Sequence, residues 1–121
     1  MNSILTSTKK RLGMTEEYEC FDEDIIAGIN TVLATLNQIG VGPPEGFAIE
    51  DKNTEWSEFV SDNNVLLNLV KTYVYLKVRL VFDPPQSSAV MSSIDSQIKE
   101  IEWRIYTEAE HWNREEECQN G

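Results

Sequence analysis

The apolar positions between Lys71 and Gln86 fit two different secondary structures. In the stretch KTYVYLKVRLVFDPPQ, a β-strand would place every second residue on one face: Val74, Leu76, Val78, Leu80 and Phe82. A helix fits a longer stretch, because apolar residues also recur at steps of three and four: Leu66, Leu69, Val70, Tyr73, Leu76 and Leu80. The strand stays open on pattern alone, but it needs a turn inside LVKTYVYLKV, which has no Gly, Pro or Asn. We therefore predict a helix over residues 64–82 that Pro84 and Pro85 end.

The most regular apolar pattern lies near the end of the chain. Its apolar residues recur at alternating steps of three and four: Met91, Ile94, Ile98, Ile101 and Ile105. Trp112 falls on the same seam one heptad after Ile105. Glu108 interrupts the seam. We predict a helix that is capped by Ser87 or Ser88, packs closely on another helix and runs to about Trp112. Residues 113–121 are expected to form a frayed acidic tail.

Two further helices are expected before residue 40. A short one over residues 2–12 ends at Gly13, a favourable C-cap residue. A second one starts near Asp22 with three consecutive acids, which suit the free N–H groups and the positive end of the helix dipole. Its wide apolar stripe continues to Ile39, and Gly40 ends it.

The middle of the chain contains a loop and a short helix. Residues 41–53 are rich in Gly and Pro and too long for a tight turn. Thr54 is expected to cap a short helix through Trp56 and Phe59, and Asp62 or Asn63 to cap the helix that follows. The patterns together predict one all-α domain over residues 1–121: a bundle of four to five helices, with two long helices joined at the Pro–Pro turn.

Composition and charge narrow the range of functions. The chain has 121 residues and a formal net charge of −11, and its only basic cluster is Lys9, Lys10 and Arg11. Such a surface does not favour binding to nucleic acid phosphates, which depends on cations. We find no secretory signal and no run of about 20 apolar residues that would span a membrane, so an intracellular protein is expected. Cys20 and Cys118 are expected to be free thiols.

Candidate catalytic and metal-binding groups have simpler explanations. His111 is the only histidine, and its acidic surroundings near the end of the chain favour a surface position. The run from Asp22 to Asp24 lacks the glycine and the last glutamate of a calcium loop, so a helix start explains it better. The stretch GVGPPEG has no following lysine and loses N–H groups to proline, so it does not fit a phosphate loop. We therefore expect no enzyme activity, no metal and no cofactor.

Aromatic side chains point instead to an interface between proteins. If the inner helix faces fill the core, then Tyr75, Trp103, Tyr106 and either Lys77 or Arg79 lie partly outside it. Aromatic residues and arginine are enriched in protein interfaces, although a small domain can also absorb such residues in its own core. The loop over residues 41–53 is a second candidate contact, through Val41, Pro43, Pro44 and Phe47.

The stretch from Leu69 to Ile105 resembles the small head–tail connector, or adaptor, proteins of tailed bacteriophages and prophages. Members from phages of Gram-positive hosts typically show a K-T-Y-x-Y-L-K-x-R-L-x-F-D-P-P block, followed by an isoleucine-rich helix with a Glu-Trp-Arg triplet. The matching positions here are Lys71, Thr72, Tyr73, Tyr75, Leu76, Lys77, Arg79, Leu80, Phe82, Asp83, Pro84, Pro85, Glu102, Trp103 and Arg104. This close match covers about a third of the chain; the order of helices and loops is compatible over most of the rest.

The resemblance implies an all-helical virion protein that is assembled in the host bacterial cytoplasm. It implies a ring of identical copies beneath the portal protein, which extends the DNA channel and docks a stopper or tail-completion protein. Passing DNA would not be bound specifically, and an acidic lumen would lower friction on it. The family brings no enzyme activity, metal or cofactor. The short acidic tail departs from the family pattern, so its contact with the portal or the channel stays open.

Two other classes of protein remain as alternatives. A small acidic inhibitor that mimics DNA fits the charge of −11, but the acids cluster at helix starts and in the tail instead of following one face. A helical regulatory module without a ring is also compatible with the patterns. Neither alternative would bind a portal protein.

Overall fold

A computed structural model of the chain describes residues 3–61 and 63–120, with side chains described as far as Glu110. Within these residues the chain forms five α-helices: α1 (Ile4–Arg11), α2 (Asp22–Ile39), α3 (Trp56–Phe59), α4 (Asn64–Phe82) and α5 (Ser88–Asn120). The only extended pairing in the described part is an isolated bridge between Ser3 and Glu55. The predicted all-α fold is confirmed, and the strand interpretation of the stretch after Lys71 is wrong.

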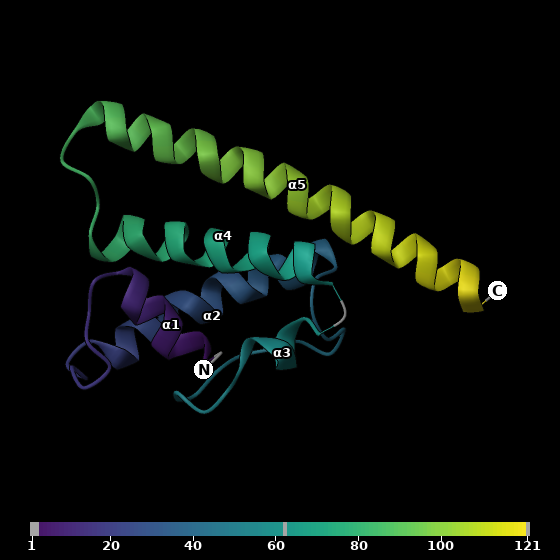
Figure 1. The fold of residues 1–121 in the computed structure, drawn as a ribbon, viewed down its shortest axis with the longest axis horizontal. Helices are drawn as coiled ribbons and strands as arrows, with labels where there is room; N and C mark the ends of the chain where they lie inside the picture. Colours follow the sequence, from purple (N-terminus) through teal and green to yellow (C-terminus); the bar gives the residue numbers. More distant parts are fainter. Residues whose placement is uncertain (1–2, 62, 121) are drawn as a thin grey trace.

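Helix α4 occupies the centre of the fold. It packs against α1, α2 and α5, so α5 covers one side while α1 and α2 cover the other (Figure 1). Its buried side chains therefore point in several directions: Leu66, Val70, Tyr73, Val74, Leu76 and Val78. Val74 and Val78 belong to the alternating pattern, and they are buried because the helix has neighbours on more than one face. This explains why the sequence also resembled a strand.

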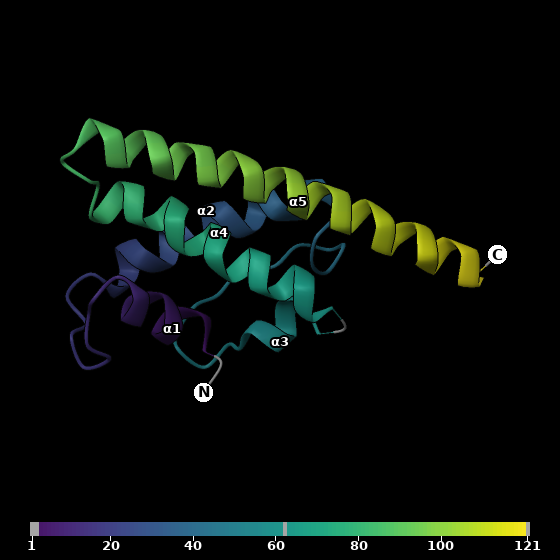
Figure 2. The same ribbon diagram turned by 45° about the horizontal axis from the view of Figure 1, so that its top comes forward.

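Helices α4 and α5 form an antiparallel hairpin through residues 83–87 (Figure 2). Asn63 caps α4 by accepting a hydrogen bond from the backbone N–H of Leu66. Ser87 accepts a long hydrogen bond of 3.4 Å from the N–H of Val90 at the start of α5. Both positions agree with the predicted caps.

The inner seam of α5 faces the rest of the fold. Ile94, Ile98 and Ile105 are buried, and Ala109 continues this seam after Glu108. The helix runs to Asn120, so the predicted end near Trp112 was too early. The last part of α5 extends beyond the other helices (Figures 1 and 2).

An ion pair joins α1 to the start of α2. The Nζ of Lys9 lies 2.8 Å from Oδ1 of Asp22 and donates a hydrogen bond to the carbonyl oxygen of Glu16, and only 3% of the Lys9 side chain is exposed. The Lys9–Asp22 contact is a close ion pair and not a directional hydrogen bond. Phe21 occupies the N-cap position of α2 without a side-chain hydrogen bond. The first acid of α2 thus pairs with α1, and its predicted role as a cap is wrong.

The loop between α2 and α3 folds back onto the core. The side chain of Asn30 both donates to and accepts from the backbone of Ile49, at 3.0 and 2.8 Å. The cap of α3 is Glu55, which forms a reciprocal capping box with Glu58, so the prediction of Thr54 as the cap is wrong. The backbone carbonyl of Thr54 instead accepts from the N–H of Ile4.

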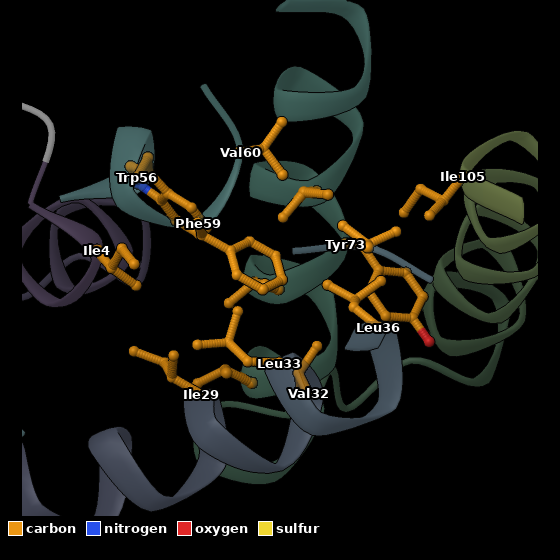
Figure 3. Packing of buried hydrophobic residues seen from close by; sticks show 14 of the residues in the cluster. Ile4, Ile29, Val32, Leu33, Leu36, Trp56, Phe59, Val60, Tyr73 and Ile105 are labelled. Carbon is orange, nitrogen blue, oxygen red and sulfur yellow. The ribbon is translucent and has the colours of Figure 1, made fainter. Parts of the chain in front are cut away.

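The main core lies between α2, α3 and α4 (Figure 3). The phenyl ring of Phe59 and the indole of Trp56 reach into it from α3, opposite Ile29 and Leu33 of α2. The indole N–H of Trp56 donates a hydrogen bond of 2.8 Å to Oγ of Ser7, which satisfies its polar atom and ties α3 to α1. The core thus joins all the segments around α4.

Two glycines with the same backbone angle provide a matched test of this packing. Gly13 and Gly42 both have φ +86°, but an added Cβ at Gly42 would overlap the Phe59 ring, while one at Gly13 would meet nothing within 4 Å. We expect Gly13→Ala to lower the free energy of unfolding by about 1 kcal/mol through backbone strain alone. Gly42→Ala should lower it by about 2 kcal/mol more, because the core has no space for the methyl group. Urea unfolding measures both; equal losses would contradict the packing of Phe59.

Candidate functional site

The residues of the 71–85 motif mostly hold the helices together. Tyr73 and Leu76 are buried, and Tyr73 lies between α2 and α5 with its hydroxyl directed toward α5 (Figure 3). That hydroxyl donates a hydrogen bond of 3.0 Å to the carboxylate of Glu102. The Nζ of Lys77 lies 5.9 Å from the centre of the Tyr73 ring, within the range of a cation–π contact. Tyr73 therefore links α4 to α5.

Other motif residues contact the remaining helices. Tyr75 faces α1, where the guanidinium of Arg11 lies 4.5 Å from its ring centre. The Phe82 ring lies 6.5 Å from that of Phe21, next to the start of α2. Lys71 is half-buried and lines a groove beside α1. The motif residues of α4 thus contact α1, the start of α2 and α5.

The end of the motif forms the turn of the hairpin. The backbone N–H of Asp83 donates to the carbonyl of Arg79 at 2.8 Å, which closes the last turn of α4. Asp83 and Pro84 are exposed, whereas Arg79 and Pro85 are half-buried. The two prolines stop α4, and α5 starts soon after them with the opposite direction.

The outer face of α5 carries the most exposed aromatic pair. Trp103 is 67% exposed and Tyr106 is 50% exposed, and their rings stack at 6.4 Å with an interplanar angle of 20°. The neighbouring Arg104 forms an exposed ion pair of 3.0 Å with Glu100 one turn earlier. The side chain of Trp103 thus stays in water, although it belongs to the residue types that anchor protein interfaces.

Two hollows flank Trp103. One of about 400 Å³ lies toward the start of α4 and is lined by Val65 and Leu69 together with Thr107 and Glu108 of α5. The other, of about 430 Å³, lies toward the end of α2 and is lined by Ile39, Lys99 and Tyr106, among others. We call the exposed residues Val65, Trp103 and Tyr106, with the two hollows, the Trp103 surface. A ridge between hollows has the shape that a complementary protein surface can fit.

The loop over residues 41–53 contributes less surface than expected. Val41 is fully buried and Phe47 is half-buried, with its ring 5.1 Å from that of Phe59. The carbonyl of Pro43 accepts a hydrogen bond of 2.6 Å from Asn37, which holds the start of the loop against α2. Val41 therefore belongs to the core, which contradicts its place among the candidate contact residues. Of the four candidates only Pro44 is exposed, and Pro43 is half-buried.

Two residues have positions that were not predicted from the sequence. Val65 is an apolar residue at the start of α4, but it is 62% exposed because the helix turns it away from the core. Lys9 belongs to the basic cluster of residues 9–11, but its side chain is buried against Asp22. The apolar positions around Val65, read at helical spacing, could have placed it on the outer face. No local signal distinguishes Lys9 from its neighbour Lys10.

The described residues show no arrangement typical of a metal site. Within them, no group of three or more histidine, cysteine or acidic side chains is placed to hold a metal ion. Cys20 is a free, exposed thiol. The predictions for His111, Trp112 and Cys118 concern side chains outside the described part of the chain. Among the described helices, none combines the length and the apolar content of a membrane span.

Comparison with known proteins identifies the family. The sequence model of the phage connector protein family matches residues 4–111, which contain α1 to α4 and most of α5. The chain therefore belongs to this family, and it has the structural connector role of a phage virion component. Neither a search of curated proteins nor a search of solved structures found a match. The resemblance noted in the 71–104 stretch is thus confirmed over a much longer part of the chain.

The link between Tyr73 and Glu102 predicts a loss of stability at high pH. Burial, then the hydrogen bond and the charge of Glu102, raise the pKa of Tyr73 from 10.0 to about 12. The folded state holds the Tyr73 proton more tightly than the unfolded state does. The contribution of this link to the free energy of unfolding is therefore complete below pH 10.0 and is lost as the pH rises toward about 12. Tyr73→Phe should lower the free energy of unfolding by about 1 kcal/mol at pH 7.

Urea unfolding at pH 8 and pH 11 measures this effect. The difference between the original chain and Tyr73→Phe should shrink as the pH rises, because Phe cannot lose a proton. Tyr106→Phe is the control, since Tyr106 is half exposed and no change of this kind is expected. A difference that stays constant between the two pH values would contradict the buried Tyr73–Glu102 link.

Proposed function

We propose that this phage connector protein assembles as a ring of identical copies beneath the portal protein at the junction of head and tail. The ring extends the DNA channel and docks a stopper or tail-completion protein. The observation that carries this proposal is the Trp103 surface, an exposed aromatic ridge on a helix whose inner face is already packed. Family membership supports the connector role, and the surface supplies a place for protein contacts.

A ring requires that each copy use two different faces. One face of a copy contacts another face of the next copy, and the contact repeats until the ring closes. The α4–α5 hairpin is suited to this because its inner side is filled by the core while Trp103, Tyr106 and Val65 stay outside. Aromatic side chains in such positions supply much of the binding free energy when they become buried. We infer that the Trp103 surface is one of the two faces, or the face that meets the portal.

The charge of the chain fits a channel that DNA passes without being held. With a formal net charge of −11, the surface as a whole repels phosphates. An acidic lumen would lower the friction on DNA as it passes. A DNA-mimic inhibitor would need its acids in rows that imitate phosphates, whereas the acids in this sequence cluster at helix starts and near the end of the chain.

Adding the protein to purified portal tests this function. Electron microscopy should show an added ring of density on the portal for the original chain. Trp103→Ala should require about 100-fold more protein for the same ring occupancy, the effect of losing a strong interface anchor. Its free energy of unfolding should change by less than about 0.5 kcal/mol, because Trp103 lies mostly in water.

A second variant separates this effect from a general loss of apolar surface. Val90→Ala removes another exposed apolar side chain of α5, far along the helix from Trp103, and should leave ring occupancy unchanged. If Trp103→Ala forms rings as readily as the original chain, the Trp103 surface is not a contact. If the original chain adds no ring to the portal, the proposed function itself is wrong.

A further inference from the structure

A groove beside α1 gathers basic side chains on an otherwise acidic protein. It has a volume of about 540 Å³ and is lined by one face of α1, the linker that follows and one residue of α4. Its charged residues are Lys10, Arg11, Lys71 and Glu16, so it carries three positive charges and one negative charge. We call this the basic groove. The chain has only ten basic residues and a net charge of −11, which makes this grouping unusual for the molecule.

The cations of the basic groove are not neutralised within the described part of the chain. The neighbouring Lys9 is paired with Asp22, but no described carboxylate forms an ion pair with Lys10, Arg11 or Lys71. Arg11 is held in place by its contact with the Tyr75 ring, at 4.5 Å. A hollow with unpaired cations, one of them held by an aromatic ring, is suited to an anionic group from outside.

The end of α5 is one of two strongly acidic segments of the chain, the other being residues 16–24. Residues 108–120 contain Glu108, Glu110, Glu115, Glu116 and Glu117 and only one basic residue, Arg114. The backbone of this segment is helical to Asn120 and extends past the body of the molecule (Figures 1 and 2). α1, with the basic groove, lies toward the opposite end. The two charged elements of one copy therefore point away from each other.

We propose that the acidic end of α5, residues 108–120, binds the basic groove of a neighbouring copy. This proposal rests on the proposed function, because it supplies the contact between copies that a ring needs. Since α1, which lines the groove, and the end of α5 lie toward opposite ends of one molecule (Figure 1), the contact joins unlike faces and can repeat around a closed ring. Repulsion between two acidic copies is screened beyond about 8 Å at physiological salt, so the local opposite charges determine the contact.

DNA is a weaker candidate for the basic groove. The affinity for phosphates grows with the number of cations that displace counterions, and the groove offers only three. The rest of the surface is strongly acidic and opposes the approach of a long polyanion. The acidic helix end of another copy presents only a short anionic segment and projects from its own body, so fewer like charges come within the screening length.

Charge exchange between the two elements tests the proposal on the full chain. One double variant combines Lys10→Glu with Lys71→Glu, and the other combines Glu115→Lys with Glu116→Lys. Each should raise the protein concentration needed for ring assembly on the portal by at least about tenfold. All four substitutions together should restore assembly, because the charges are exchanged and attract again. Arg11 is left unchanged because it also packs on Tyr75.

A matched control separates local contact from net charge. The control variant keeps Lys10→Glu and Lys71→Glu but adds Glu45→Lys and Glu50→Lys in place of the two α5 substitutions. It has the same net charge as the rescued chain, but its changed acids are exposed residues of the loop before α3. This control should not restore assembly. If it restores assembly as well as the α5 exchange does, or if the two double variants assemble normally, the proposal is wrong while the ring itself stands.

Chemical cross-linking decides the contact independently of the portal. A carbodiimide joins lysine to glutamate at contact distance, and mixing chains of two nitrogen isotopes identifies links between copies. We expect links from Lys10 or Lys71 to residues 115–117 between copies at high protein concentration. Their absence overturns the proposal even if rings form. If the links form but no ring is added to the portal, the contact between copies stands and the proposed function is wrong. If the protein instead binds DNA in a salt-sensitive way that depends on Lys71, the groove binds phosphates and the proposed contact is wrong.

Discussion

The fold depends on the burial of α4 from several sides at once. α1 and α2 cover one part of this helix and α5 covers another, so its apolar residues satisfy contacts with three neighbours. Tyr73 shows how the constraint works: its ring fills space between α2 and α5, and its hydroxyl is satisfied by Glu102. Most apolar side chains of α4 are therefore buried or half-buried, and Val65 and Val81 are the exposed exceptions. The two most exposed aromatic side chains of the described residues, Trp103 and Tyr106, lie on the next helix, α5.

The sequence predicted the helices well because their signals are local. The bounds of α2 and α4 follow from Gly40, from the Asn63 cap and from the two prolines after Phe82. The candidate site was harder to predict, because exposure depends on which helices lie next to one another. Trp103 and Tyr106 were expected outside the core and are found there. Val41 was expected on the surface, but Asn30 and Asn37 bind the loop back onto the protein.

Charge acts on two scales in this molecule. Over the whole surface the net charge of −11 opposes contact with nucleic acid, which fits the proposed channel that DNA passes without being held. Locally, the sign changes: Lys9 is used inside the fold, while its neighbours Lys10 and Arg11 remain available in a groove. Of three successive basic residues, Lys9 thus stabilises the fold while Lys10 and Arg11 lie at the surface. This difference arises because Asp22, at the start of α2, lies next to Lys9.

The central claim is that the chain is fully folded before assembly and that assembly uses the outside of α5. Hydrogen exchange of backbone amides, compared between the free chain and the portal-bound chain, tests this most directly. The amides of α4 should exchange slowly in both states, at a rate set by global unfolding. Added protection on binding should concentrate in α5 and the segments beside it. Fast exchange of α4 in the free chain, with protection gained only on assembly, would contradict the account.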